Sequence, residues 1–241
     1  MCFTIHIHSS RDAIEKRFGV DTTALQDFQF RYFVRAFDNP RLPVITASEP
    51  QRVQLMNWGL IPDWAKDREQ AMLVRKGTYN ARAESLEEKP SFRKAYESGR
   101  CWIIASGFYE WQHAGKSKIP WLIQLKNEDL FAFAGIYDTW NDKSTGESVN
   151  GFSIVTTRAN PMMEKIHNSG KRMPVILNQD MEKIWLEPVL KKDEASSIFL
   201  PYGQDLMKSH TIGKKITDKD ADPNDPGIIL PVDYYTNGTL F

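Results

Sequence analysis

The stretch from Cys101 to Trp111 is the most apolar segment of the chain and constrains its fold most strongly. Its residues are CWIIASGFYEW, and a near-continuous apolar run is typical of a strand that is buried on both faces. Glu110 ends the run between two aromatic residues. Burial raises the pKa of a carboxylic acid, which is how proteins make a general acid or base from glutamate. Glu110 is thus a candidate acid or base. The alternative is a glutamate just beyond the buried part that pairs with an arginine, and Cys101 is interpreted as core.

Further strands and short helices are indicated by periodicity on both sides of this run. Residues 2–8 alternate with period two, with Phe3, Ile5 and Ile7 on one side. Other segments are predicted to be strands: 28–33, 42–46, 52–58, 121–125, 130–137, 152–157 and 172–177. Helices are predicted within 10–27, 87–99, 179–186 and 193–200, and after Asn160-Pro161, where proline favours the first helical position.

The bulk composition is that of a globular protein, with 41% hydrophobic and 26% charged residues. The formal net charge is zero, so any nucleic-acid site has to be a local patch. Two cysteines are too few for a disulfide framework. No signal pattern and no apolar run of about 18–20 residues is present. We therefore expect a soluble, cytoplasmic protein without a membrane partner.

Met1-Cys2 is chemically unusual, because removal of Met1 leaves Cys2 with an α-amine and a thiol on adjacent carbons. These groups titrate near ~7.7–8.0 and ~8.5 in unperturbed peptides, so both are nucleophiles near neutral pH. An aldehyde forms a Schiff base with the amine, and the thiol then closes a thiazolidine ring. The alternative is that Cys2 is a small buried hydrophobe, as most free cysteines are.

The histidines suggest two further hypotheses, a metal site and a proton donor. Cys2, His6 and His8 share one face of the first strand, and these residue types bind zinc. No Cys-x-x-Cys or His-Glu-x-x-His spacing supports a metal site. We therefore favour the interpretation that both histidines lie on the solvent-facing side of an edge strand, and we predict no metal. His167 falls at the far end of the helix after Asn160, where a helix terminus favours a protonated histidine and hence a proton donor.

Polar and aromatic residues mark two other stretches. Asn80, Arg82 and Glu84 face one way if their segment is extended, as in a polar site or a solvated edge strand. Trp58 and Trp64 are core residues or platforms on which a base stacks, and the sequence favours the core interpretation.

Taken together, the motifs resemble the SRAP family, the SOS response-associated peptidases or abasic-site processing proteins. Six blocks occur in order over residues 1 to about 205. They are Met1-Cys2, Trp58–Trp64 (WGLIPDW), Tyr79–Glu84 (YNARAE), Gly107–Trp111 (GFYEW), Thr156–Asn160 (TTRAN) and Arg172–Leu177 (RMPVIL).

The resemblance implies an α+β fold, in which a single domain has a branched, partly barrel-like antiparallel β-sheet flanked by short helices. We expect this catalytic domain to span residues 1–205, with a peripheral C-terminal tail at 206–241 packed on it or extending from it. The implied function is a covalent thiazolidine crosslink between Cys2 and the open aldehyde of abasic sites in single-stranded DNA. Such a protein would need no cofactor and would act as a monomer. Its substrate would be single-stranded DNA, including DNA at junctions between single and double strands. On DNA damage it would associate with the nucleoid.

The resemblance also implies roles for individual residues. Cys2 matches the nucleophile, Asn80 the amide that holds the opened sugar, Glu110 the acid/base beside the amine, and His167 the histidine that opens the sugar ring and reverses the crosslink. Residues assigned to DNA contacts are Arg82, Trp111, Arg172, Trp58, Thr156 and Lys171.

The chain departs from the family pattern twice. Phe3-Thr4 replaces the usual Gly-Arg after Cys2, which removes one basic contact. Asn168 to Lys171 separate His167 from Arg172, so Lys171 can share the phosphate role.

Two other classes of function remain open. One is a thiol peptidase that uses Cys2 on peptide bonds, including removal of Met1, although no Cys/His/Asn constellation is evident. The other is a non-catalytic DNA- or metal-binding module built on His6 and His8.

Overall fold

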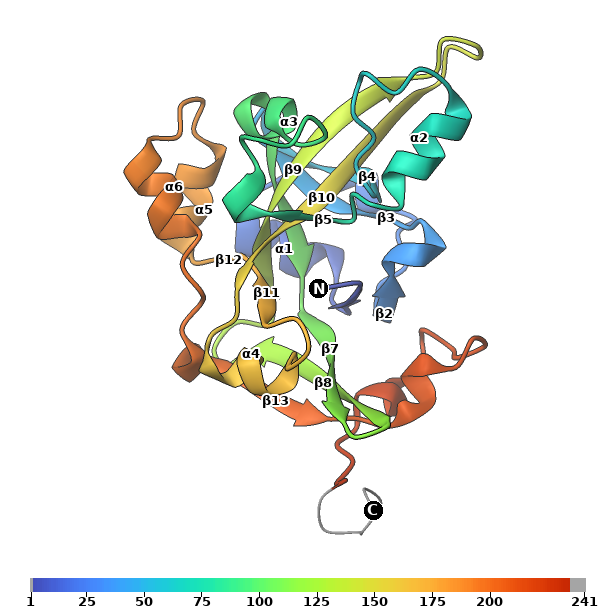
Figure 1. Cartoon of the computed structure of the whole chain (residues 1–241), viewed down its shortest axis with the longest axis vertical. Helices are drawn as coiled ribbons and strands as arrows, with labels where there is room; N and C mark the ends of the chain where they lie inside the picture. Colours follow the sequence, from blue (N-terminus) through green and yellow to red (C-terminus); the bar gives the residue numbers. More distant parts are fainter. Residues whose placement is uncertain (1, 235–241) are drawn as a thin grey trace.

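A computed structural model describes residues 2–234 of the chain, as a single domain of strands and short helices (Figure 1). The predicted removal of Met1 concerns a residue outside this range. The strands are β1 (Thr4–Ile7), β2 (Arg31–Arg35), β3 (Arg41–Thr46), β4 (Glu49–Trp58), β5 (Asn80–Arg82), β6 (Arg100–Ala105), β7 (Gly107–Ala114), β8 (Ser117–Leu125), β9 (Phe131–Asn141), β10 (Ser148–Arg158), β11 (Arg172–Pro174), β12 (Ile176–Leu177) and β13 (Met207–Thr211). The α-helices are α1 (Arg11–Phe18), α2 (Arg68–Arg75), α3 (Arg93–Ser98), α4 (Pro161–Ile166), α5 (Gln179–Leu186) and α6 (Lys192–Ile198).

Five of the strands close into a barrel in the order β4-β3-β6-β9-β10, because β10 pairs with both β9 and β4. Most of these pairings are antiparallel, but β10 runs parallel to β4 and to β5, so the sheet is mixed. Buried aromatic and branched side chains fill the interior, among them Ile103, Phe133 and Phe152. The predicted α+β class and the partly barrel-like, branched sheet are thus confirmed.

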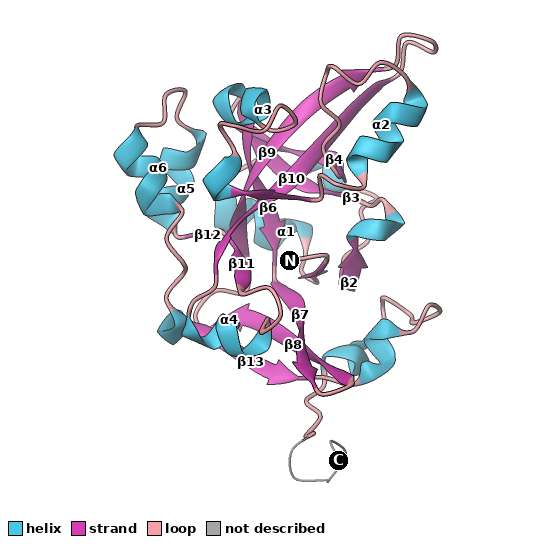
Figure 2. Ribbon diagram, in the orientation of Figure 1, coloured by secondary structure: helices cyan, strands magenta, loops and turns pink. Residues whose placement is uncertain are grey.

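A second sheet has the order β13-β8-β7-β1-β2 and lies below the barrel in the orientation of Figure 2. The chain enters it directly from the barrel, since β6 ends at Ala105 and β7 begins at Gly107. The single strand predicted over 101–111 is therefore wrong. At the junction, the Ser106 amide donates to His6 in β1 over 2.8 Å, and a Cβ on Gly107 would lie 2.8 Å from the Ile123 carbonyl oxygen.

The helix ends follow local sequence signals. Ser10 caps α1 by accepting a hydrogen bond from the Ala13 amide over 3.1 Å, and Gly19 ends the helix in the left-handed conformation. Helix α1 is thus shorter than the predicted 10–27. Asn160 caps α4, and Pro161 occupies its first turn as expected. None of the helices in the described range has the length and apolarity needed to cross a membrane.

The segment after residue 205 is partly built into the domain. Strand β13 pairs with β8 from Met207 to Thr211. Beyond it, Ile212, Ile216 and Ile228 are buried in one apolar cluster with Tyr109 of β7. Over this stretch the predicted C-terminal tail at 206–241 thus packs on the domain, and its apolar side chains complete the second sheet. Residues 235–241 lie outside the described range.

Candidate functional site

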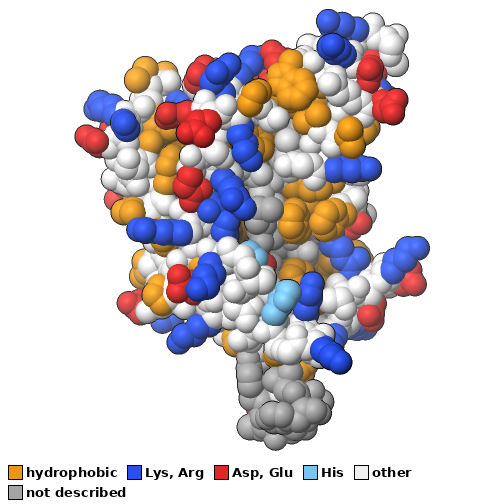
Figure 3. All heavy atoms as spheres, in the orientation of Figure 1, with side chains coloured by type: hydrophobic (Ala, Val, Ile, Leu, Met, Phe, Trp, Pro, Cys, Tyr) orange, Lys and Arg blue, Asp and Glu red, His pale blue; other side chains and the backbone are white. Residues whose placement is uncertain are grey.

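A cavity of about 640 Å³ lies where β7 and the first strand meet the end of α4 and the C-terminal segment. Its walls include Phe3, Glu110, Trp111 and His167. Figure 3 shows histidine side chains beside Lys and Arg side chains near the middle of this face. The structure thus brings two predicted proton-transfer residues and one predicted stacking residue to a single hollow.

Cys2 is fully buried directly behind this cavity, next to Phe3 in its wall. The Cys2 thiol lies 3.8 Å from the Thr4 carbonyl oxygen. Burial raises the pKa of this thiol well above its usual range, and the negative charge of Glu110 raises it further. The Cys2 sulfur is accordingly a neutral thiol near pH 7, so its reaction requires a base to accept its proton.

Asn80 holds the backbone of Cys2 from the other side. Its side-chain amide donates to the Cys2 carbonyl oxygen over 2.9 Å, and the residue is 8% exposed. Strand β5 delivers Asn80 there because it runs parallel to β10, with Asn80 in register with Ile154. The side-chain oxygen of Asn80 is buried without a hydrogen-bond partner in the described part of the chain. It is therefore an acceptor available to an amine or a sugar hydroxyl.

Glu110 combines burial with access to the cavity. It is 3% exposed, lies on β7 in register with Trp121 of β8, and contributes to the cavity wall. Its charge acts on the Cys2 thiol. This position suits a carboxylate that moves protons to and from the groups of Cys2.

His167 is the C-cap of α4, as the sequence predicts for the helix end, and is 8% exposed. Its Nδ1 lies 2.9 Å from the Arg172 carbonyl oxygen and 3.3 Å from the Arg172 amide nitrogen. With Nδ1 engaged by the backbone, Nε2 lies on the other edge of the ring. Gly170 packs beside that edge, since an added Cβ would lie 2.8 Å from Nε2.

Arg172 is engaged with protein groups rather than open to solvent. Its guanidinium forms a bidentate pair with Glu84 over 3.0 and 2.9 Å and donates to the Thr156 carbonyl oxygen over 2.6 Å. The Arg172 side chain is 12% exposed. A phosphate would have to displace Glu84 to reach it, so the predicted DNA contact at Arg172 stays a prediction.

Two residues assigned to DNA contacts, Trp58 and Thr156, are buried, so a contact through their side chains stays a prediction that would require rearrangement. Trp58 has no exposed surface, stacks on Phe152 and donates its indole N–H to the Tyr79 carbonyl oxygen over 3.0 Å. No face of its ring is left for a base. Thr156 is also fully buried, where its oxygens accept hydrogen bonds from Arg172.

The remaining predicted contacts lie at the surface. Arg82 and Lys171 are exposed, and Trp111 is half-buried in the cavity wall. Lys171 adopts a left-handed backbone with φ of 48°, which follows from the tight turn after α4. Each of the three can reach a ligand without rearrangement of the core.

Several cavity residues were not predicted from the sequence: Phe3, His113, Lys116, Lys118, Ser169 and Lys214. Lys116 and Lys118 flank Ser117 in the β7–β8 hairpin. Two lysines at this spacing around a turn could have indicated a basic site from the sequence. Lys214 carried no such signal, because only the fold brings the C-terminal segment to the cavity.

His6 of β1 and His8 just after this strand are held by protein contacts. His6 Nδ1 bonds the Tyr32 carbonyl oxygen over 2.7 Å, and the His8 ring stacks on Tyr32 with centroids 4.0 Å apart. Among residues 2–234, no cluster of three or more His, Cys, Asp and Glu side chains is arranged to hold a metal ion.

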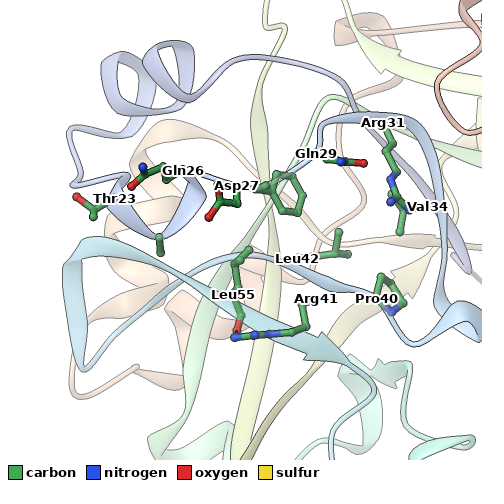
Figure 4. A pocket seen from close by; sticks show the side chains of 12 residues that line it. Thr23, Gln26, Asp27, Gln29, Arg31, Val34, Pro40, Arg41, Leu42 and Leu55 are labelled. Carbon is green, nitrogen blue, oxygen red and sulfur yellow. Dashed lines mark hydrogen bonds between the residues drawn. The ribbon is translucent and has the colours of Figure 1, made fainter.

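Another cavity, of about 660 Å³, lies on the outer face of the barrel beside β3 and β4 (Figure 4). Its polar side chains include Asp27, Arg31 and Arg41, and Arg41 donates to the Leu55 carbonyl oxygen over 2.9 Å. None of the predicted site residues lines it.

Comparison with known proteins identifies the family. The family model described as "SOS response associated peptidase (SRAP)" matches residues 1–219. Abasic site processing protein YoqW of Bacillus subtilis (strain 168) is 39% identical over 219 residues, which are 90% of this chain and 94% of YoqW. Abasic site processing protein HMCES of Gallus gallus is 34% identical over 163 residues, or 58% of this chain and 47% of HMCES.

Solved structures agree with this result. A crystal structure of a protein from Bacteroides thetaiotaomicron has a TM-score of 0.90 and 40% identity, over 96% of this chain and all of that one. A second, from Bordetella bronchiseptica, has a TM-score of 0.75 at 23% identity, over 88% of this chain and 100% of that one, and shows the shared fold alone. With a family model and a relative that each match most of its length, the chain belongs to the SOS response associated peptidase (SRAP) family.

Proposed function

We propose that this protein processes abasic sites in single-stranded DNA by forming a covalent crosslink through Cys2. The observation that carries the proposal is the grouping of Cys2, Asn80 and Glu110 behind a cavity that Glu110 and His167 line. Relatives named abasic site processing proteins support the substrate. Trp111 in the wall suits stacking on a base of any sequence.

The chemistry requires that Met1 is removed, so that Cys2 carries a free α-amine. His167 protonates the ring oxygen of the closed sugar, the bond from C1′ to that oxygen breaks, and the C1′ hydroxyl loses its proton to water, which leaves the aldehyde at C1′. The amine adds to C1′, and water leaves to give a Schiff base. The Cys2 sulfur then adds to C1′ and loses its proton, which closes the thiazolidine. Overall, aminothiol and aldehyde yield one thiazolidine and one water.

Glu110 and Asn80 serve different steps of this sequence. Glu110 takes the proton from the ammonium, returns one to the departing hydroxyl, and finally accepts the thiol proton. That last step matters because burial keeps the sulfur protonated near neutral pH. Asn80 fixes the Cys2 carbonyl and offers its oxygen to the amine or the sugar hydroxyl.

The first prediction tests the proposed reaction directly. After incubation with single-stranded DNA that carries one abasic site, intact mass should equal the Met1-free protein plus the oligonucleotide minus one water. Cys2→Ala keeps the amine but lacks the thiol, so strand cleavage by β-elimination should replace the stable adduct. Absence of any adduct, or a heat-stable adduct of Cys2→Ala without borohydride, would exclude the thiazolidine mechanism.

The second prediction assigns the proton transfers. Glu110→Gln should slow adduct formation by about 10²–10⁴-fold, the usual contribution of one acid/base group. His167→Ala should slow both formation and reversal, because the same proton moves in each direction. A gel time course with an abasic oligonucleotide measures both rates. If folded Glu110→Gln protein formed the adduct as fast as the wild-type protein, Glu110 would have no role in the proton transfers.

A further inference from the structure

Three lysines give the rim of the reaction cavity an excess of positive charge. Lys116 and Lys118 belong to the β7–β8 hairpin, and Lys214 begins the 3-10 helix η5 (Lys214–Thr217). All three are exposed, and none of them forms an ion pair with another residue of the described range. Glu110 is the only acidic side chain among the described residues that line this cavity.

The packing of the C-terminal segment fixes Lys214 at this rim. Ile212 and Ile216, on either side of it, are buried at 0% and 1% exposure. Arg35 of β2 donates to the carbonyl oxygens of Ile216 and Asp218 over 2.6 and 2.8 Å. The lysine is therefore anchored by two apolar neighbours and two backbone hydrogen bonds.

The adjacent lysine is in a different electrostatic state. Lys215 pairs with Asp225 over 2.7 Å and does not line the cavity. Two consecutive lysines thus have different surroundings: a carboxylate neutralises Lys215, whereas Lys214 lines the cavity and its ammonium lies 6.0 Å from the ring centroid of Tyr234. This difference provides an internal control.

Resting on the proposed function, we infer that Lys116, Lys118 and Lys214 bind backbone phosphates of the single-stranded DNA beside the abasic site. The cavity already contains the reacting groups and a stacking residue, so the strand that enters it must run across its rim. Ammonium groups that form no ion pair with the protein release counterions from that strand when they bind phosphates. The C-terminal segment after residue 205 accordingly takes part in substrate binding.

Equilibrium binding tests the three lysines without the covalent step. The probe is a single-stranded oligonucleotide with a tetrahydrofuran abasic analogue, which has no aldehyde, and affinity is measured between about 50 and 200 mM salt. Each phosphate contact contributes a slope of about −0.7 in log K against log salt for single strands. The triple variant Lys116→Gln, Lys118→Gln and Lys214→Gln should therefore lose about two units of slope.

The matched control removes three exposed lysines outside this cavity and has the same net charge: Lys126→Gln, Lys143→Gln and Lys215→Gln. Its slope should stay within about half a unit of wild type, the size of less than one phosphate contact. An unchanged slope in the cavity variant, or an equal fall in the control, would overturn the inference.

Failure of this inference is distinguishable from failure of the proposed function. If the abasic adduct still forms but the slope of log K against log salt does not change, the three lysines do not bind phosphates, while the crosslinking proposal stands. If the wild-type protein forms no adduct with a reactive abasic oligonucleotide, the proposed function fails, whatever the slopes are.

Discussion

His6 is a buried histidine that couples the stability of the first strand to pH. It is 4% exposed, and its ring contacts Tyr32 and Tyr109. Burial, together with the nearby His8, lowers the pKa of His6 from 6.5 to about 4, although the hydrogen bond to the Tyr32 carbonyl opposes this. The folded state therefore holds a neutral imidazole at pH values where the unfolded chain holds a protonated one.

The third prediction follows from this difference in proton binding. Between pH 6.5 and about 4 the unfolded state binds more protons, so the free energy of unfolding falls as the pH falls. The loss should be about 1.4 kcal/mol per pH unit in this window. His6→Asn, which keeps a donor toward Tyr32, should remove this dependence, whereas the exposed His8→Asn should not. Urea titrations at several pH values measure it, and identical pH slopes in His6→Asn and wild type would contradict it.

At the residue scale, the sequence predicted which residues lie close together better than it predicted which are exposed. Cys2, Asn80, Glu110 and His167 were assigned from motifs, and the structure brings them together. The sequence favoured a core role for Trp58 but left a stacking role open, because its burial depends on Phe152, which follows it by 94 positions and joins it only through the barrel. Pairs that depend on tertiary contacts leave no local pattern.

At the element scale, a side chain of the turn after α4 bridges that turn to β7. Asn168 accepts from the His113 amide over 3.0 Å and donates to the His113 carbonyl over 2.8 Å. These two bonds replace a missing strand pairing and tie the His167 turn to the strand that carries Glu110. Asn168 is one of the residues by which the chain departs from the family pattern.

The fourth prediction concerns this bridge. Asn168→Ala should slow adduct formation by about 10- to 100-fold, because small displacements of catalytic groups have effects of that size. Gly170→Ala should act in the same direction, since its Cβ would push on the His167 ring. Asn150→Ala removes an amide partner of Thr139 on the barrel and serves as the control. A wild-type rate in folded Asn168→Ala protein would show that the bridge does not position His167.

The periodicity of the sequence located most helices and strands, but it did not show that the run 101–111 is divided into two strands, β6 and β7. The run 101–111 has no proline or charged break at Ser106, so its sequence gives no sign that β6 and β7 belong to different sheets. The break depends on the Ser106 hydrogen bond to β1 and on close contact at Gly107. Both are tertiary contacts, and local propensity does not encode them.

At the scale of the whole molecule, the C-terminal segment closes the second sheet. Its composition of Asp, Pro, Gly and Lys suggested a peripheral tail, because isolated isoleucines without periodicity do not predict a strand or a core. In the structure these isoleucines cover Tyr109 and Leu122, on the two strands next to the cavity that Glu110 and His167 line. The domain defined by packing therefore extends beyond residue 205.

The last prediction tests that boundary by truncation. A chain that ends at residue 205 loses β13 and the buried side chains of Met207, Ile212, Ile216 and Ile228. Each such side chain contributes about 1.5–3 kcal/mol by burial, so the sum of about 6–12 kcal/mol is comparable to the whole stability of a typical domain. The truncated chain should be unfolded or insoluble, whereas the full-length protein should melt cooperatively. Circular dichroism melting of the two chains is the measurement. A cooperative transition of the 1–205 fragment at the full-length melting temperature would show that the second sheet is stable without its C-terminal strand.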